Sequence, residues 1–315
     1  MAPASNGTPR LSVVTPLFNC LERTKEMVES LRASIPKNIP YEVILVDDGS
    51  TDGTRQWLSG LGDPFRVLLN ERNVGYGAST NRGAAAARGA VLALLNDDLV
   101  LPGGWLQPML SALGRGVGVV GNVQVDAATG LVDHAGIWVN LKGKPEHVRS
   151  SPGWARRLLR PRPGVFAVTG ACMLVRAETW RRLGGFDEGF VNGGEDLDFC
   201  LRTRAAGLGV VLARRSRVLH HVSSSPGRKL RDEENSQRLV LRWRQALAVE
   251  ASRLWTRGHF AQVLPEPRDF PDKREALQMA LYILHLAWSP PASAVAAMGE
   301  AVDLELARWR QMFTR

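Results

Sequence analysis

Four short apolar segments near the start of the chain constrain its fold more than any other feature. They are rich in Val, Leu and Ile and occupy residues 11–17, 41–46, 65–69 and 91–95. Segments with helical spacing separate them, for example the one that carries Met27, Leu31 and Ile35. Buried strands that alternate with helices are typical of a mostly parallel sheet with helices on both faces. The sequence therefore predicts an α/β fold of the Rossmann-like type.

Two of these segments are followed at once by acidic and amide side chains. Asp47 and Asp48 follow the second segment, and Asn96-Asp97-Asp98 follows the fourth. Crossovers between parallel strands are right-handed, so the carboxyl ends of these strands meet at one edge, where open α/β sheets bind ligands. Carboxylate and amide oxygens suit Mg²⁺ or Mn²⁺, especially when the ion also carries substrate phosphates. The alternative is a solvated turn, because Asn and Asp are common turn formers.

The remainder of the chain continues this pattern and then becomes helical. Further strands are expected at 117–125, 165–175, 210–213 and 218–219, and helices at 177–183, 197–206, 232–256, 273–287 and 292–312. Residues 142–164 are rich in Pro, Gly and Arg and predict a long basic loop. We expect one catalytic domain over residues 1–260 and a C-terminal helical extension over residues 261–315.

Composition restricts the partners and the compartment. The chain has 315 residues and a formal net charge of +9, which favours an anionic partner: a phosphorylated substrate, an anionic membrane surface or nucleic acid. The three cysteines have no CxxC spacing, so a disulfide framework or zinc site is not expected. Residues 1–10 lack an apolar core, and 276–288 is too short and polar to span a membrane. We expect a cytoplasmic protein, with peripheral contact to the inner face of the cell membrane as a hypothesis.

Several motifs occur in the order and spacing of a known family. They are Val13–Asn19, Val46–Asp52, Asn73-Val74-Gly75, Asn81-Arg82-Gly83, Asn96-Asp97-Asp98, Gly185–Glu188 and Glu195–Arg202. Over roughly residues 10–255 the chain resembles the family 2 glycosyltransferases, and most closely their bacterial rhamnosyltransferase-type branch. The resemblance implies a GT-A fold. It also implies inverting transfer of a sugar, with rhamnose as one candidate, from a nucleotide-diphosphate donor to a glycan or lipid-linked acceptor of the cell surface.

The resemblance also implies which residues bind the donor. Thr15, Pro16, Asn19, Asp48, Asn73, Arg82, Asn96 and Asp97 match positions on the donor side. Asp48 at a strand end is expected to accept hydrogen bonds from a pyrimidine base or the ribose. An ordinary strand-to-loop turn is the alternative for this region.

A divalent cation, Mg²⁺ or Mn²⁺, is the expected cofactor. Asn96-Asp97-Asp98 falls at the family's DXD motif with Asn in place of the first Asp, and Asp98 is the expected metal ligand. Of the pair His220-His221, we favour His221 as a second ligand, with a purely structural histidine as the alternative. The cation would stabilise the negative charge that develops on the diphosphate as the bond to the sugar breaks.

Inversion requires a general base on the acceptor side. Asp196, preceded by Glu195, matches the family's base, and both are taken as catalytic candidates. The alternative is that the two acids complement a helix N-terminus. Asp198 and Arg202 have i, i+4 spacing and predict a structural ion pair.

Two other classes of protein remain as alternatives. A sugar nucleotidyltransferase would require a Gly-rich loop after the first strand, which residues 15–19 do not provide. For a basic nucleic-acid-binding module, the sequence lacks the helix, zinc and aromatic signatures, so no nucleic acid partner is expected.

Basic residues that would contact an acceptor diphosphate or an anionic membrane are Arg149, Arg156, Arg157, Arg160, Arg162, Arg214, Arg215, Arg217, Arg228, Lys229 and Arg231. A solvated basic face is the alternative. The sequence does not specify an oligomeric state.

Overall fold

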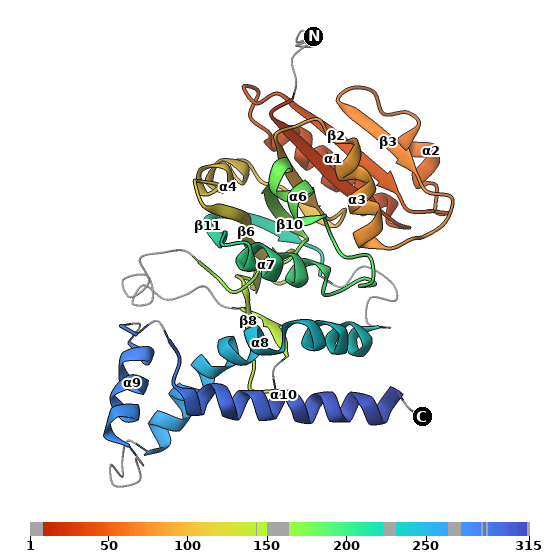
Figure 1. Cartoon of the computed structure of the whole chain (residues 1–315). Coiled ribbons are helices and arrows are strands. Elements are labelled where there is room, and N and C mark those ends of the chain that lie inside the picture. The colour runs from red at the N-terminus through yellow and green to blue at the C-terminus, as the bar shows by residue number, and fades with distance from the viewer. Residues whose placement is uncertain are drawn as a thin grey trace.

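A computed structural model describes residues 9–142, 144–149, 164–222, 231–263, 272–284, 286–287 and 289–313 (Figure 1). The strands are β1 (Leu11–Leu17), β2 (Tyr41–Asp47), β3 (Phe65–Leu69), β4 (Val91–Leu95), β5 (Leu99–Val100), β6 (Val117–Asp126), β7 (Val132–His134), β8 (Ile137–Val139), β9 (Pro145–His147), β10 (Cys172–Arg176) and β11 (Gly209–His220). The helices are α1 (Leu21–Ser34), α2 (Thr54–Leu58), α3 (Tyr76–Ala86), α4 (Leu106–Ala112), α6 (Ala177–Leu183), α7 (Glu195–Ala205), α8 (Asp232–Val263), α9 (Lys273–Ile283) and α10 (Ala292–Phe313).

One nine-stranded sheet organises the described chain, in the order β3-β2-β1-β4-β10-β6-β11-β5, with β7 paired to β6. The first four strands are parallel, so their carboxyl ends lie at one edge as predicted. β10 runs antiparallel between β4 and β6 and joins this parallel half to a mixed half. The predicted α/β fold is confirmed, but the sheet as a whole is mixed and not mostly parallel, because β10, β5 and β7 each pair antiparallel with their neighbours.

Helices cover both faces of the sheet because strand side chains alternate between the faces. On one face, Val13 packs with Met27 of α1 and Trp105 beside α4. On the other face, Val14 packs in a cluster that extends to α6, α7 and the C-terminal helices. Gly83 of α3 belongs to this second face, where an added Cβ would lie 2.5 Å from Val14 Cγ1. Close approach between helix and sheet therefore requires glycine at this position.

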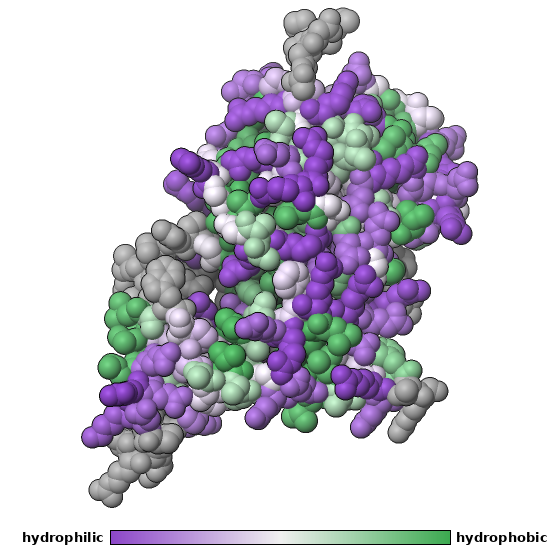
Figure 2. All heavy atoms as spheres, viewed as in Figure 1, coloured by the Kyte–Doolittle hydropathy of each residue, from purple (hydrophilic) through white to green (hydrophobic). Residues whose placement is uncertain are grey.

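The C-terminal helices share the core of the sheet domain. Leu247 and Ala251 of α8 are buried in the same cluster as Val302 and Leu306 of α10. The expected division at residue 260 falls inside α8, three residues before its end at Val263. None of the described helices has both the length and the apolar content needed to cross a membrane. Apolar side chains nevertheless gather on the surface over α9, at the lower left of Figure 2.

Three expected strands differ from the structure. The apolar segment 165–175 forms a regular strand only from Cys172 onward, and the residues before it form a turn beside the pocket described below. The two short strands expected at 210–219 are one strand, β11, with a register shift between Ala213 and Arg217. Elements β5, α4, β7, β8 and β9 are short and were not expected from the sequence pattern.

Candidate active site

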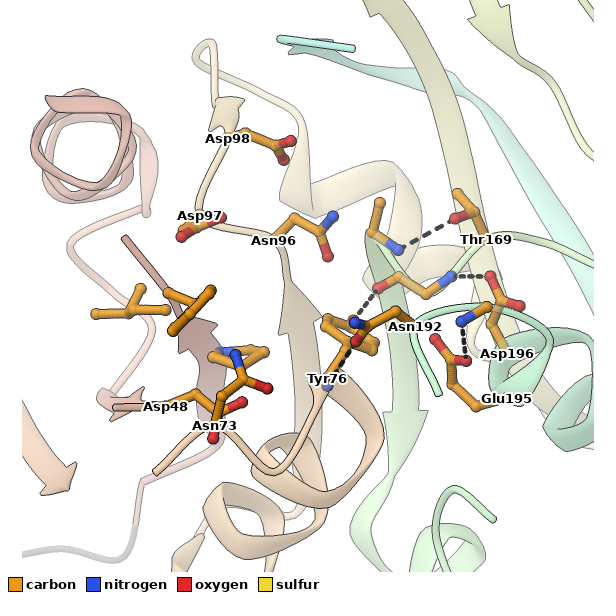
Figure 3. Close-up of a pocket in the computed structure, with 16 residues that line it drawn as sticks. Asp48, Asn73, Tyr76, Asn96, Asp97, Asp98, Thr169, Asn192, Glu195 and Asp196 are labelled. Atoms are coloured by element: carbon orange, nitrogen blue, oxygen red, sulfur yellow. Dashed lines mark hydrogen bonds between the residues drawn. The ribbon is translucent and has the colours of Figure 1, made fainter. Parts of the chain in front are cut away.

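A pocket opens at the carboxyl ends of β1, β2 and β4 (Figure 3). Its lining comes from seven places in the chain and consists of Pro16, Leu17, Phe18, Asp48, Asn73, Tyr76, Asn96, Asp97, Asp98, Thr169, Gly170, Ala171, Asn192, Gly193, Glu195 and Asp196. Strand ends of the parallel half supply one wall. The turn before β10 and the start of α7 supply the opposite wall. The pocket therefore joins the two groups of acids that the sequence singled out.

Asp48 anchors the first wall. Its Oδ1 accepts hydrogen bonds from Asn70 Nδ2 at 2.7 Å and the Val74 amide at 2.9 Å, and its Oδ2 accepts one from the Gly75 amide at 2.9 Å. A carboxylate offers about four acceptor positions, so one position on Oδ2 remains for a ligand. The loop approaches closely at Gly49, where φ is +84° and an added Cβ would lie 2.8 Å from the Asn73 nitrogen. Only glycine fits this turn.

The segment Asn96-Asp97-Asp98 lies between the two walls. The Asn96 amide donates to the carbonyl of Ala171 at 2.9 Å, which fixes the end of β4 against the turn before β10. Burial, together with the neighbouring Asp98 carboxylate, raises the pKa of Asp97 to about 8. Ionisation of both neighbouring carboxyl groups is therefore costly unless a cation is present.

The two histidines at the end of β11 face different partners. Antiparallel pairing of β11 with β5 places His220 Nε2 3.3 Å from Asp98 Oδ1, and both side chains are buried. His220 Nδ1 lies 3.7 Å from Asp133 Oδ2 on β7. His221, favoured from the sequence, instead has Nε2 3.1 Å from Glu26 Oε2 of α1. The structure thus brings the imidazole of His220 to the Asp98 carboxylate, whereas His221 contacts Asp98 through its backbone N–H, which donates to the Asp98 carbonyl at 3.0 Å.

The donor atoms at Asp98 and His220 can share one cation. Two ligands in adjacent positions of an octahedral ion, each about 2.1 Å from it, are about 3 Å apart, close to the 3.3 Å observed between Asp98 Oδ1 and His220 Nε2. Among the described residues no group of three or more His, Cys, Asp or Glu forms a complete metal site. A cation here would take its other ligands from water and phosphate, as Mg²⁺ commonly does.

Asp196 anchors the opposite wall at the start of α7. Its Oδ2 accepts a hydrogen bond from the Gly170 amide at 2.9 Å, and its Oδ1 accepts one from the Leu197 amide at 2.7 Å. The preceding Glu195 carboxylate accepts one from the Gly193 amide at 2.8 Å and so closes the turn before the helix. Each Asp196 oxygen keeps acceptor capacity on its pocket side, as proton abstraction requires.

Tyr76 connects the two walls across the pocket. Its hydroxyl donates to the Gly170 carbonyl at 2.9 Å, and its amide donates to Asn192 Oδ1 at 3.2 Å. Burial, followed by the charges of Glu195 and Asp196, raises the Tyr76 pKa well above its ordinary value. The phenol therefore remains protonated and keeps its bond to Gly170.

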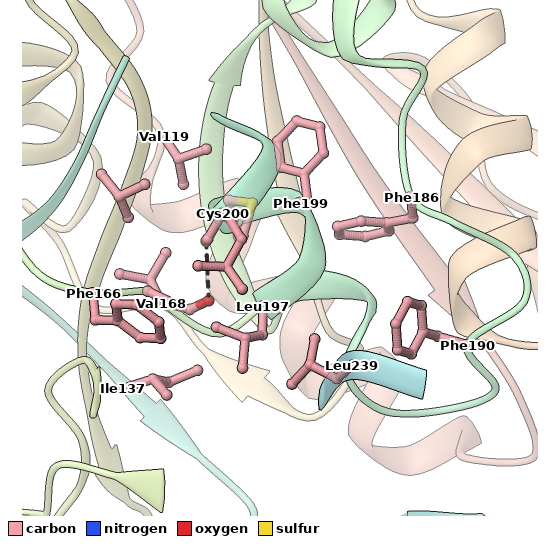
Figure 4. Close-up of a cluster of buried hydrophobic side chains, with 14 of the residues drawn as sticks. Val119, Ile137, Phe166, Val168, Phe186, Phe190, Leu197, Phe199, Cys200 and Leu239 are labelled. Carbon is pink, nitrogen blue, oxygen red and sulfur yellow. Dashed lines mark hydrogen bonds between the residues drawn. The ribbon is translucent and has the colours of Figure 1, made fainter. Parts of the chain in front are cut away.

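Apolar and ionic contacts hold α7 in place. Leu197, Phe199 and Cys200 point into the cluster that contains Phe186 and Phe190 (Figure 4). On the same helix, Arg202 Nε donates to the buried Asp198 carboxylate at 2.7 Å, which confirms the expected ion pair. Trp243 Nε1 of α8 also donates to Asp198, at 2.9 Å. The base candidate thus sits on a helix fixed by both the sheet domain and α8.

Three residues expected at the donor site do not line the pocket. Thr15 is fully buried within β1. Asn19 connects two loops, because its Oδ1 accepts a hydrogen bond from the Thr51 amide at 2.7 Å. Arg82 on α3 donates to the Leu69 carbonyl at 2.8 Å. Pro16, Asp48, Asn73, Asn96, Asp97, Asp98, Glu195 and Asp196 do line it, as expected.

Sequence reasoning missed Tyr76, Asn192 and the role of the turn at residues 169–171. The signals were small residues at Thr169-Gly170-Ala171 and the turn-forming Asn192 before the two acids. Asn192 has a φ of +54°, which is uncommon outside glycine and consistent with a tight turn. Neither signal identifies a pocket residue until long-range contacts place it.

Comparison with known proteins identifies the family. The family model described as Glycosyl transferase family 2 matches residues 12–184, more than half of the chain. The chain belongs to glycosyl transferase family 2. A further model, Glycosyl transferase family group 2, matches residues 158–299.

Two relatives of this family 2 chain are named for O-antigen biosynthesis and for rhamnosyl transfer. It is 34% identical over 239 residues to the O-antigen biosynthesis protein RfbC of Myxococcus xanthus, covering 70% of this chain and 18% of that protein. It spans 26% of the length of a second relative, the protein y4gI of Sinorhizobium fredii. It is 29% identical over 218 residues to the N-acetylglucosaminyl-diphospho-decaprenol L-rhamnosyltransferase of Mycobacterium tuberculosis, covering 62% of this chain and 71% of that enzyme.

The fold is that of the GT-A glycosyltransferases. The crystal structure of GalNAc-T7 with UDP, GalNAc and Mn²⁺ superposes with a TM-score of 0.60 at 19% identity. The superposition covers 87% of this chain and 55% of that one. The predicted GT-A fold is therefore confirmed.

Proposed function

We propose that this chain transfers a sugar from a nucleoside-diphosphate donor to a hydroxyl group of a glycan or lipid-linked acceptor, with inversion at the anomeric carbon. The observation that carries the proposal is the shared pocket of Asp48, Asp98 and Asp196. Asp48 lies on the wall built from strand ends, and Asp196 on the opposite wall. A donor bound along the first wall would present its sugar to an acceptor activated at the second.

The nucleoside is assigned to the Asp48 wall. The remaining acceptor position on Asp48 Oδ2 suits an imide N–H, as in uracil or thymine, or a ribose hydroxyl. Phe18 and Asn73 line the same side of the pocket and complete this wall. We assign Pro16, Asn96 and Asp97 to the donor as well, and Thr15, Asn19 and Arg82 to support of the loops around it. A UDP- or dTDP-sugar, such as an activated rhamnose, is the donor class that fits.

The reaction itself is assigned to Asp196. Its carboxylate accepts the proton of the attacking hydroxyl as that oxygen bonds to the anomeric carbon from the face opposite the leaving group. The bond between the anomeric carbon and the diphosphate oxygen breaks, and its electron pair leaves with the nucleoside diphosphate. Glu195, which closes the turn at Gly193, shapes the acceptor side of the pocket next to the base.

We assign a divalent cation, Mg²⁺ or Mn²⁺, to Asp98 and His220. Such an ion, when bound, stabilises the negative charge on the departing diphosphate. The partly buried Asp133 beside His220 Nδ1 has the place of the carboxylate that commonly orients a metal-binding imidazole. Asn96, which replaces an acid of the family motif, leaves the site with less negative charge of its own.

Donor binding tests the proposal directly. We expect one class among UDP-, dTDP- and GDP-sugars to raise the midpoint of thermal unfolding, more strongly with Mn²⁺ than with EDTA. At a ligand concentration 100 times its Kd, binding contributes about 2.7 kcal/mol, a shift that is readily measured. Asp48→Asn is the matched variant, because its amide would place a donor against the Gly75 N–H. Absence of any shift with all three classes in the wild-type protein would exclude the proposal.

A peripheral contact with an anionic membrane is a second part of the proposal. Leu277, Leu284 and Leu286 are 55–68% exposed on and just after α9, and the helix begins at the exposed Lys273 and Arg274. Such a surface suits the interface of an anionic bilayer. Arg156, Arg157, Arg160, Arg162, Arg228 and Lys229, also expected to contribute, lie outside the described residues. Sedimentation with phosphatidylglycerol vesicles should depend on salt and on Leu277, and absence of binding would exclude this contact.

A further inference from the structure

His134, at the end of β7, is a fully buried side chain that does not line the pocket. Its Nε2 accepts hydrogen bonds from two backbone amides, those of Gly136 and Thr169, each at 3.3 Å. The Gly136 contact is local, whereas the Thr169 contact joins β7 to the turn that precedes β10. A buried imidazole thus holds one end of a pocket-lining turn.

These contacts require a neutral imidazole. An Nε2 atom that accepts two N–H groups carries no proton, so the ring proton lies on Nδ1. Burial, together with the neighbouring His147, lowers the pKa of His134 well below its ordinary value. The rings of His134 and His147 meet edge to face with centroids 4.8 Å apart. The surroundings of His134 therefore favour the neutral ring, and the two amide contacts of Nε2 select its tautomer.

The turn at residues 169–171 connects His134 with the pocket. The Gly170 amide, one residue beyond Thr169, donates to Asp196 Oδ2 at 2.9 Å. The Gly170 carbonyl accepts a hydrogen bond from the Tyr76 hydroxyl, and the Ala171 carbonyl accepts one from the backbone N–H of Asn96, both at 2.9 Å. There is little free space, since a Cβ added to Gly170 would lie 3.3 Å from Asp196 Cβ. A displacement of the turn would therefore displace the Asp196 carboxylate.

We propose that His134 is a positioning residue for Asp196: its Nε2 fixes the 169–171 turn, and the Gly170 amide of that turn fixes the carboxylate. A base must stand within hydrogen-bond reach of the acceptor hydroxyl, and a misplacement of about 1 Å can reduce the rate about 100-fold. Loss of the acceptor at Nε2 would leave two buried backbone amides unpaired. The turn would then shift to a position in which these amides form other hydrogen bonds. The inference deepens the proposed function and rests on the assignment of Asp196 as base.

Two variants of His134 separate positioning from packing. In His134→Gln, the side-chain oxygen can reach the place of Nε2 and still accept the two amides. In His134→Leu, the side chain fills similar space but accepts nothing. Hydrogen exchange followed by mass spectrometry should show Thr169 and Gly170 exchanging about 10-fold faster in His134→Leu and near the wild-type rate in His134→Gln. A peptide from β2 serves as the internal control, and equal exchange in all three proteins would overturn the inference.

Steady-state kinetics supply the second readout, with the nucleotide sugar that stabilises the wild-type protein. We expect kcat to fall on the order of 10- to 100-fold in His134→Leu, with the donor Kd within about twofold of wild type and kcat restored in His134→Gln. A parallel loss of kcat and donor affinity in both variants would overturn positioning. If His134→Leu does not fold, Gly170→Ala perturbs the same turn, and an unchanged kcat there would also overturn it. Hydrogen exchange needs no substrate, so it tests whether His134 fixes the turn even if no donor is found, whereas kcat tests the link to Asp196.

Discussion

The two walls of the pocket are built in different ways. In the parallel half, Asp48, Asn96 and Asp98 each lie within a few residues of the end of a parallel strand, and short loops hold them. In the mixed half, Asp196 depends on Gly170, and His220, which contacts Asp98, lies more than 100 residues beyond it in the chain. The parallel half thus places its side chains by local chain geometry. The mixed half places them by pairing distant segments.

The difference predicts different consequences of substitution. Changes at strand ends of the parallel half should act on donor affinity, because the proposed function assigns the nucleoside to these side chains. Changes in the mixed half should act on turnover or on metal affinity, because the proposed function assigns the base and one metal ligand to it. Each of the following predictions would sharpen this division or contradict it.

Asp196→Asn should give the largest effect. An amide cannot accept the hydroxyl proton, so kcat should fall about 10²- to 10⁴-fold, the usual contribution of general base catalysis. The donor Kd should stay within about twofold, since Asp196 lies on the wall opposite Asp48, to which we assign the nucleoside. Product formation measured at saturating donor, together with calorimetric titration of the donor, provides both quantities.

Asp187→Asn is the matched control for Asp196→Asn. Asp187 lies outside the pocket and pairs with Arg238 at 3.1 Å and Arg242 at 2.9 Å on α8. Its loss should lower stability slightly, because the pairs are partly exposed, and leave kcat within about twofold. Comparable losses of kcat in both variants would show that the mixed half acts through stability and not through a base.

His220→Ala and His221→Ala should differ in metal affinity. If His220 binds the cation with Asp98, its removal should weaken Mn²⁺ binding by at least about 10-fold in the presence of the nucleoside diphosphate. His221 contacts Glu26 and Arg23 on α1, so its removal should change that affinity by less than about twofold. Electron paramagnetic resonance of free Mn²⁺ gives the two constants. The reverse result would assign the ligand to His221, as favoured from the sequence.

The parallel half could be predicted from sequence because its signals are local. The expected strands 11–17, 65–69 and 91–95 coincide with β1, β3 and β4, and the acids after β2 and β4 line the pocket as expected. The choice between His220 and His221 could not be made, because it depends on the two-residue strand β5 and its register against β11. The roles of His134, Tyr76 and Gly170 likewise arise from contacts between distant segments.

Glu42→Gln should give the smallest effect on function while affecting stability. Glu42 lies near the amino end of β2, at the edge of the sheet opposite the pocket, and is 3% exposed. Its carboxylate accepts hydrogen bonds from Ser12 Oγ at 2.7 Å, the Arg88 amide at 2.7 Å and Arg66 Nη1 at 2.9 Å. At pH 7 the variant should lose about 1–3 kcal/mol of unfolding free energy, as for other buried polar groups that lose a partner. Donor Kd and kcat should stay within about twofold of wild type.

The stability difference between wild type and Glu42→Gln should depend on pH. Burial tends to raise the pKa of Glu42, but the hydrogen bonds from Arg88, Ser12 and Arg66 outweigh it, so the pKa lies below its ordinary value of 4.5. A depressed carboxylate pKa contributes stability above the unfolded-state pKa and loses it as the pH falls through the folded-state value. Urea unfolding at pH 7 and at successively lower pH below 4.5 should therefore show the difference shrinking. A constant difference would mean that the carboxylate charge contributes nothing. A change in donor Kd would contradict the assignment of donor binding to the carboxyl ends of the parallel strands.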